Sequence, residues 1–159
     1  MTPLEVAGPL LRDALFSGLA ALGFAILFNV PRRTLPGCVI CGAAGHSLRL
    51  ALMQFGLSIE SATLIGAALV GLLGVYFSHR QSVPAPIFTV SGAIPMVPGV
   101  FAYQAMISII ALASADAQTG GPVLANAMIN AIKTALILGA IALGIAAPAL
   151  LFRRRRPIV

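Results

Sequence analysis

Residues 83–103 read VPAPIFTVSGAIPMVPGVFAY. This stretch is apolar enough to lie in a membrane, yet it contains four prolines and two glycines. Each interior proline removes a backbone donor and clashes with the preceding turn, so a continuous helix is not expected here. Broken helices are tolerated at membrane depth where they are buried in protein or line a polar cavity. We therefore expect this stretch to form the centre of a transport site, with Pro95, Pro98 and Gly99 as its hinge.

The composition indicates an integral membrane protein. Of the 159 residues, 59% are hydrophobic and 9% are charged, and the mean hydropathy is +1.01. A soluble domain carries about 25% charged residues. The net charge is +6, and residues 153–156 supply four of the ten basic residues directly after an apolar run. This flank is typical of an anchor at anionic lipid headgroups, so we expect a lipid bilayer as the partner and no nucleic acid.

The hydrophobic pattern predicts an all-α, polytopic membrane helix bundle that forms a single membrane domain over residues 1–159. The expected spans are residues 10–28, 35–55, 59–77, 84–113 and 122–152, and the fourth is the broken one. With Arg32, Arg33 and Arg80 on the cytoplasmic side, the positive-inside rule favours five spans, with the N-terminus outside and the C-terminus inside. Four spans remain the alternative, because residues 35–55 are weak by hydropathy.

Small residues at a spacing of four recur along the predicted spans. Two examples are Ala67 with Gly71 and Ala140 with Gly144. Such pairs allow helix backbones to approach closely in lipid, so we expect tight helix contacts at these positions.

Polar side chains follow one face of three predicted spans. His46 and Arg49 share a face of the second span because they are three residues apart. Gln104 and Ser108 are one turn apart and follow Tyr103 in the fourth span. The last span carries a similar stripe, formed by Asn126, Asn130, Lys133 and Thr134.

Arg49 and Lys133 are the most informative of these residues. A charge near the bilayer centre costs at least about 2.5 kcal/mol, so it normally faces the protein interior, a partner or water. The acids, Glu5, Asp13, Glu60 and Asp116, lie near predicted span ends, so we expect no acid beside either cation at mid-depth. Two unmatched cations suit an anionic substrate. Snorkelling, or pairing with acids of another subunit, remains the alternative for both.

Histidine and cysteine are two further residue types that could take part in chemistry. His46 is either a packing residue or a proton relay beside Arg49, since an unperturbed imidazole titrates near about pH 6.5. Cys38 and Cys41 are expected to be small packing residues, because two sulfurs and His46 make a poor metal site. Paired inward carboxylates and a nucleophile beside a base are both missing from the sequence pattern, so we expect no enzyme, metal or cofactor.

Three segments carry a family resemblance. FNVP at residues 28–31, GHSLR at 45–49 and VSGAIPMVPGVFAY at 90–103 resemble the threonine/serine exporter family. The closest likeness is to its short, separately encoded subunit (YjjB type). The resemblance implies a component of a multi-pass exporter in the bacterial inner membrane, which a larger membrane subunit (YjjP type) completes. It also implies threonine, serine or succinate as the cargo.

These observations together predict a membrane subunit of a two-component exporter of small anionic or zwitterionic carboxylates. The expected substrate-binding residues are His46, Arg49, Tyr103, Gln104, Asn130 and Lys133. A non-transporting membrane scaffold or assembly subunit is the alternative, and association into a homo-oligomer stays open.

Overall fold

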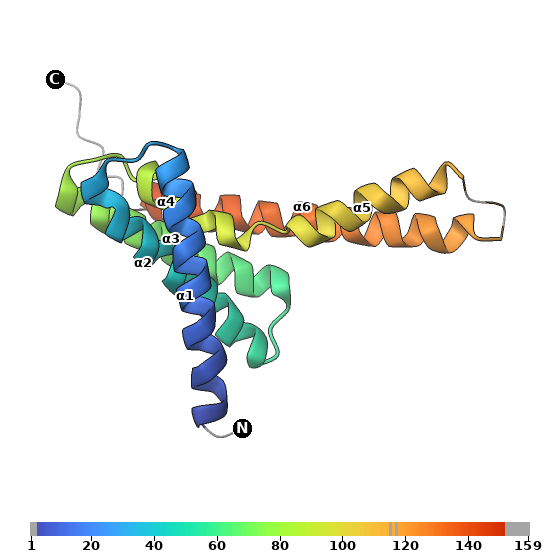
Figure 1. Ribbon diagram of the computed structural model, residues 1–159, viewed down its shortest axis with the longest axis horizontal. Coiled ribbons are helices and arrows are strands. Elements are labelled where there is room, and N and C mark those ends of the chain that lie inside the picture. Colours follow the sequence, from blue (N-terminus) through green and yellow to red (C-terminus); the bar gives the residue numbers. More distant parts are fainter. Residues whose placement is uncertain (1–2, 115, 117, 152–159) are drawn as a thin grey trace. The chain divides into compact units, whose positions relative to one another are not determined.

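The computed structural model describes residues 3–114, 116 and 118–151, and this part consists of helices joined by short connections, without a strand. The cluster 153–156, on which the cytoplasmic anchor was predicted, lies outside the described residues. The elements, labelled in Figure 1, are α1 (Pro3–Leu27), η1 (Arg32–Thr34), α2 (Leu35–Gln54), α3 (Ile59–Gln81), α4 (Pro86–Ala93), η2 (Ile94–Met96), α5 (Gly99–Leu112) and α6 (Gly120–Leu151).

The predicted all-α membrane bundle is confirmed. Among the described residues, four helices are long and apolar enough to cross a membrane, and the interrupted pair formed by Pro86–Met96 and Gly99–Leu112 brings the number to five if it counts as one span. The segment at residues 35–55, weak by hydropathy, is one of the four long helices. The orientation of the spans stays a prediction.

The expected break in the fourth span lies between η2 and α5. Pro98 precedes the first residue of α5 with φ −80° and ψ 55°, outside the helical region. The N–H of Gly99 bonds to the carbonyl of Val97 at 2.9 Å, and the N–H of Ala102 reaches the carbonyl of Pro98 at 3.1 Å. The new helix therefore starts at Gly99, because the proline cannot continue the earlier hydrogen-bond ladder.

The chain divides into two compact units. Unit 1 comprises Met1–Met96 and Ala140–Val159, and unit 2 comprises Val97–Gly139. A single membrane domain over residues 1–159 stays a prediction.

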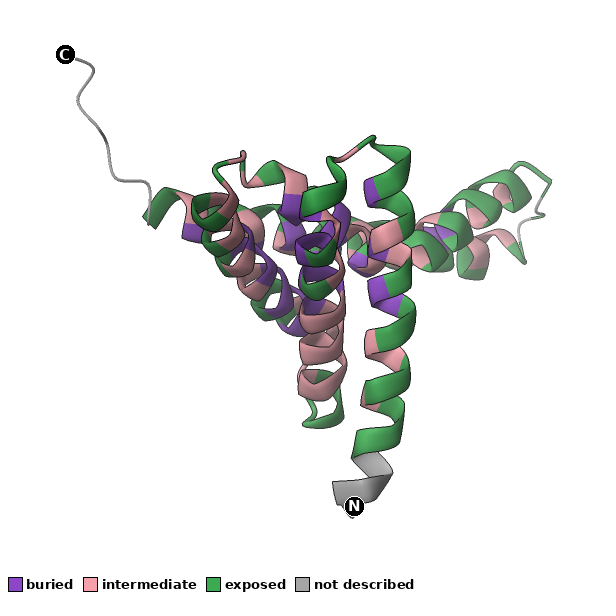
Figure 2. Ribbon diagram, turned by 60° about the vertical axis from the view of Figure 1, so that its left-hand side comes forward, coloured by how far each residue is buried: buried purple, intermediate pink, exposed green. Residues whose placement is uncertain are grey.

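In unit 1, α2 lies between its neighbours and contacts α1, α3 and α4. Buried residues are gathered on the sides of these helices that face one another (Figure 2). The backbones approach so closely that a Cβ added at Gly42 would lie 2.5 Å from the Cβ of Ala21, and one added at Gly92 would lie 2.6 Å from the Cβ of Cys41. Helices α1 and α4 therefore each pack against α2 with their backbones in close approach.

The pairs of small residues predicted in the third and last spans do form a close contact. A Cβ added at Gly144 would lie 2.6 Å from the Cβ of Ala67, and one added at Gly71 would lie 2.9 Å from the carbonyl oxygen of Ile145. The end of α6 that belongs to unit 1 therefore packs tightly on α3, as small residues allow in lipid.

Unit 2 is an antiparallel helical hairpin of α5 and the first part of α6, which run side by side in both views (Figures 1 and 2). Asp116 organises the connection, because its carboxylate accepts hydrogen bonds from the Thr119 hydroxyl at 2.7 Å and the Thr119 N–H at 2.8 Å. These bonds, the hydroxyl bond first, hold the pKa of Asp116 below its usual value. The carboxylate thus marks the start of α6, where a negative charge is favourable.

Candidate functional site

The interior of unit 1 contains an acid–imidazole pair. Nδ1 of His46 on α2 lies 2.9 Å from each carboxylate oxygen of Asp13 on α1. The hydroxyl of Ser47 also donates to Asp13, at 3.3 Å. The side chains of His46 and Asp13 are 24% and 17% exposed, so the pair is mostly buried but remains partly accessible to solvent.

This pair corrects one expectation from the sequence. Asp13 was predicted to lie near the end of its span, leaving no acid beside the inward cations. The prediction is wrong for unit 1, because α1 begins at Pro3 and Asp13 therefore lies about three turns into the helix. Its carboxylate also interacts electrostatically with Arg49. The signal in the sequence that could have identified Asp13 is its position next to Arg12 in an otherwise apolar run.

Arg49 reaches the broken span. Its Nη1 donates to the carbonyl oxygen of Met96 at 3.0 Å, and the side chain is half-buried. In a continuous helix this carbonyl would accept from the N–H four residues later, so the break leaves it in need of another donor. The guanidinium supplies that donor from α2, which ties the polar face of α2 to the broken helix in the same unit.

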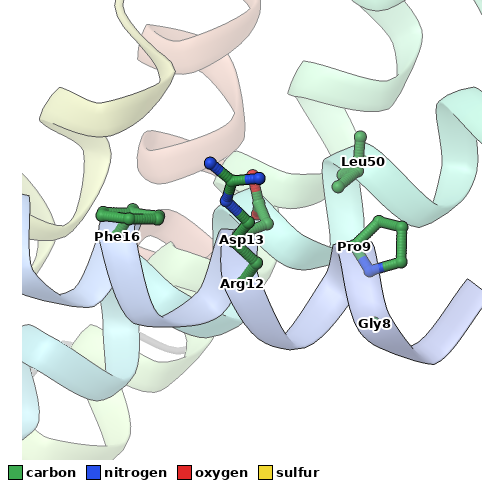
Figure 3. A pocket seen from close by; sticks show the side chains of 6 residues that line it. All are labelled: Gly8, Pro9, Arg12, Asp13, Phe16 and Leu50. Atoms are coloured by element: carbon green, nitrogen blue, oxygen red, sulfur yellow. The ribbon is translucent and has the colours of Figure 1, made fainter.

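An open pocket of about 460 Å³ lies between α1 and α2 beside the pair (Figure 3). Its lining residues are Gly8, Pro9, Arg12, Asp13, Phe16 and Leu50. The guanidinium of Arg12 lies over the ring of Phe16, 5.7 Å from its centroid. The pocket thus brings a cation and the carboxylate of Asp13 to one opening, and neither residue was among the predicted site residues.

Unit 2 brings together two of the predicted site residues. Gln104 and Asn130 line a groove of about 290 Å³ with Ile107, Ser108 and Asn126. The amide of Asn130 donates to the carbonyl of Asn126 at 2.9 Å, within α6. Tyr103 does not line this groove, and its side chain is 66% exposed. The groove therefore presents amide and hydroxyl groups that suit hydrogen bonding to a neutral or anionic ligand.

Lys133 has an aromatic neighbour in unit 2. Its Nζ lies over the ring of Phe101, 5.4 Å from the centroid. A cation over a ring face is favourable, and the interaction strengthens when water is excluded. Phe101 was not among the predicted site residues.

The two cysteines are both buried, as expected of packing residues. The thiol of Cys38 donates to the carbonyl of Ile87 at 3.4 Å, which adds a contact between α2 and α4.

Long apolar helices, one of them broken, together with an internal cluster of charged side chains define a multi-pass membrane protein. The chain belongs to the threonine/serine exporter family, because the family model described as "Threonine/Serine exporter, ThrE" matches residues 13–151. The family resemblance seen in the sequence is thereby confirmed.

A relative in Haemophilus influenzae, described as an uncharacterized protein, is 44% identical over 154 residues. The match covers 94% of this chain and 50% of the relative, so the chain spans about half the length of that protein. No solved structure matches the chain.

Proposed function

We propose that this chain is the small membrane subunit, of the YjjB type, in a two-component exporter of small carboxylates, either threonine and serine or succinate, in the bacterial inner membrane. Membership of the exporter family supports the transport of threonine or serine. The length of the relative supports a second component, because that protein carries about as much chain again beyond the matched region.

The observation that carries this proposal is the bond from Arg49 to the open carbonyl of Met96. A guanidinium has five donors in a planar fork, and the bond to Met96 uses one nitrogen of that fork. The remaining donors suit a carboxylate, which binds a guanidinium in a bidentate manner. Cargo bound here would meet the helix break directly, so binding and movement of the hinge formed by Pro95, Pro98 and Gly99 would be linked.

Four other predicted substrate-binding residues belong to unit 2. Gln104 and Asn130 offer hydrogen bonds from the groove in unit 2, and Lys133 and Tyr103 add a cation and a phenol on the same unit. Alternating access would come from movement against the larger subunit.

Replacement of Arg49 by Ala tests the proposal. A hydrogen bond to a charged group contributes about 1.5–3 kcal/mol, so we expect efflux of labelled threonine or succinate to fall at least about tenfold. Arg49→Lys should recover only part of the activity, because lysine keeps the charge but loses the fork. Efflux is measured from loaded cells that lack their own copy of the chain, with the amount in the membrane determined by immunoblot.

Arg80→Ala is the matched control, because Arg80 lies in the last turn of α3 with its guanidinium 5.6 Å from the centroid of the Tyr76 ring. It should retain efflux. If cells without the chain excrete threonine and succinate as fast as wild-type cells under load, the proposed function is wrong.

A scaffold role is the second candidate, because the same bond to Met96 would also serve to stabilise a broken helix. A scaffold would tolerate Arg49→Leu and would still stabilise a partner. Co-purification with the larger subunit, followed by flux of labelled cargo into vesicles with and without the chain, separates the two. Flux that needs both subunits supports the exporter, and flux from the larger subunit alone supports the scaffold.

A further inference from the structure

The pocket between α1 and α2 is not used by the cargo site proposed at Arg49, which does not line it. It contains two opposite charges, because Arg12 and Asp13 are both lining residues (Figure 3). Among the described residues, Asp13 forms its ion pair with His46 and not with Arg12. The guanidinium and the carboxylate therefore lie at one opening without an ion pair between them. A ligand with one group of each sign would bind to both.

Both charged groups keep hydrogen-bonding capacity for such a ligand. The guanidinium of Arg12 lies over the ring of Phe16, and a ring face leaves the five N–H donors of a guanidinium available to an anion such as phosphate. Asp13 accepts from Nδ1 of His46 and from the hydroxyl of Ser47. Because a carboxylate has about four acceptor sites, Asp13 can also accept from the N–H groups of an ammonium.

The depth of Arg12 suits a lipid headgroup. The part of α1 that is long and apolar enough to span a membrane begins at Ala7. Arg12 therefore lies about 7.5 Å along the helix axis from the start of the span. An arginine near the end of a span reaches the interface with its charged head, and lipid phosphates lie at that level.

An apolar stripe continues from the pocket along α1. Phe16 lines the pocket and is 62% exposed, and Leu19, nearly one turn further on the same face, is 64% exposed. Gly23 follows on this face, and a Cβ added there would meet nothing within 4 Å. The stripe leads from the charged groups toward the far end of the span, which is the direction in which an acyl chain extends from its headgroup.

We propose that this pocket binds a phospholipid whose headgroup carries a primary ammonium, as ethanolamine phospholipids do. Arg12 donates to the phosphate, Asp13 accepts from the ammonium, and an acyl chain covers Phe16 and Leu19. A free amino acid such as threonine has the same two charges, but it has no chain to cover the stripe. The site goes beyond the proposed export function, because its ligand is a lipid and not the cargo.

Three phospholipids with identical acyl chains test the headgroup. The ethanolamine lipid has N–H donors, the choline lipid has a quaternary ammonium without N–H, and the glycerol lipid has no cation. The full chain is purified in detergent with any membrane subunit that accompanies it, and lipid adducts are measured by native mass spectrometry. We expect the ethanolamine lipid to bind at least about fivefold more tightly than the others, because each of them lacks the charged hydrogen bond to Asp13.

Two variants assign the two ends of the headgroup. Asp13→Asn should lower the preference for ethanolamine over choline to below about twofold, because the charge that attracts the ammonium is lost. Arg12→Gln should weaken the binding of all three lipids at least about threefold, since each contains a phosphate. Arg12 is exposed, so its replacement leaves the fold intact even if Asp13→Asn, which also loses a contact with His46, does not fold.

Arg80→Gln is the matched control for Arg12→Gln. The guanidinium of Arg80 also lies over an aromatic ring, 5.6 Å from the centroid of Tyr76. Arg80 is in the last turn of α3, whereas the acid of that helix, Glu60, is in its first turn. The variant should keep both the wild-type affinity and the preference for the ethanolamine lipid.

Three results would overturn the lipid site. The first is equal binding of the ethanolamine and choline lipids by the wild-type chain. The second is wild-type affinity in Arg12→Gln, or a wild-type preference in a folded Asp13→Asn. The third is displacement of the ethanolamine lipid by excess threonine, because the pocket would then bind a free amino acid. The proposed export function is judged separately, since none of these measurements follows transport.

Discussion

At Gly42 of α2, the interior of unit 1 has no room for even one methyl group. The added Cβ would lie 2.5 Å from Ala21 and 3.1 Å from the carbonyl oxygen of Ser17, both on α1. This contact matters for the site, because the same two helices carry Asp13 and His46. We expect a larger residue at Gly42 to push α1 away from α2 and thereby to separate Asp13 from His46.

The first residue-scale prediction is that Gly42→Ala destabilises the protein by about 1–3 kcal/mol, the usual effect of overpacking a tight contact. The measurement is thermal unfolding of the purified protein in detergent. Gly23→Ala is the control, because a Cβ added at Gly23 meets nothing within 4 Å. It should leave the stability unchanged or raise it by up to about 1 kcal/mol, since alanine favours a helix. Equal melting temperatures for the two variants would contradict the packing argument.

At the scale of elements, the interruption between η2 and α5 joins the backbone to the charged site. The break leaves the carbonyl of Met96 without a donor from its own helix, and Arg49 on α2 donates a hydrogen bond to it. The proline positions therefore determine where a side chain from another helix can bond to the backbone. A continuous helix would satisfy this carbonyl internally and would leave Arg49 without its acceptor.

The element-scale prediction concerns the double variant Pro95→Ala and Pro98→Ala. The restored N–H groups should extend the helix through residues 94–100, and efflux should fall at least about tenfold because Arg49 loses its contact with the break. Hydrogen exchange of this peptide, measured by mass spectrometry, should slow in the variant. Pro36→Ala is a suitable control, since Pro36 lies in the first turn of α2, where a proline removes no needed donor. Unchanged exchange with normal efflux would show that the prolines are not the cause of the break.

At the scale of the whole molecule, the number and direction of the spans decide which side of the membrane each connection faces. Helix α2 passes the length and hydropathy test for a span, even though it carries His46 and Arg49. With α2 as a span, the positive-inside rule predicts that the connection at η1 lies on the cytoplasmic side together with Arg80.

The whole-molecule prediction is five spans with the N-terminus outside. A cysteine at Pro31, an exposed position before η1, should react with a membrane-impermeant maleimide only after the cells are permeabilised. A cysteine at Gln118 should react in intact cells. The native Cys38 and Cys41 are buried and should stay unlabelled. Labelling of both introduced cysteines in intact cells would favour the four-span alternative.

Much of this architecture could be predicted from the sequence, because it depends on local chemistry. Pro95 and Pro98 lie close together in one apolar run, and each removes a backbone donor, so the interruption near Pro98 was predictable. Residues three apart share a helical face, so His46 and Arg49 were expected together. Hydrophobic runs long enough to span a bilayer placed the long helices to within a few residues at most of their ends. Helix α1 is the exception, since it starts earlier than expected.

The partners of those residues were decided by tertiary structure. Asp13 is 33 positions from His46, and Met96 is 47 positions from Arg49. Which side chain or carbonyl lies opposite depends on the rotation and height at which α1 and the broken span pack on α2. Local spacing fixes only the face of one helix, whereas contacts between glycine-lined helices fix this register. For that reason the sequence alone determined the helix break and the polar stripe on α2. The packing of three helices decided that Asp13 pairs with His46 and that Arg49 donates to the carbonyl of Met96 at the break.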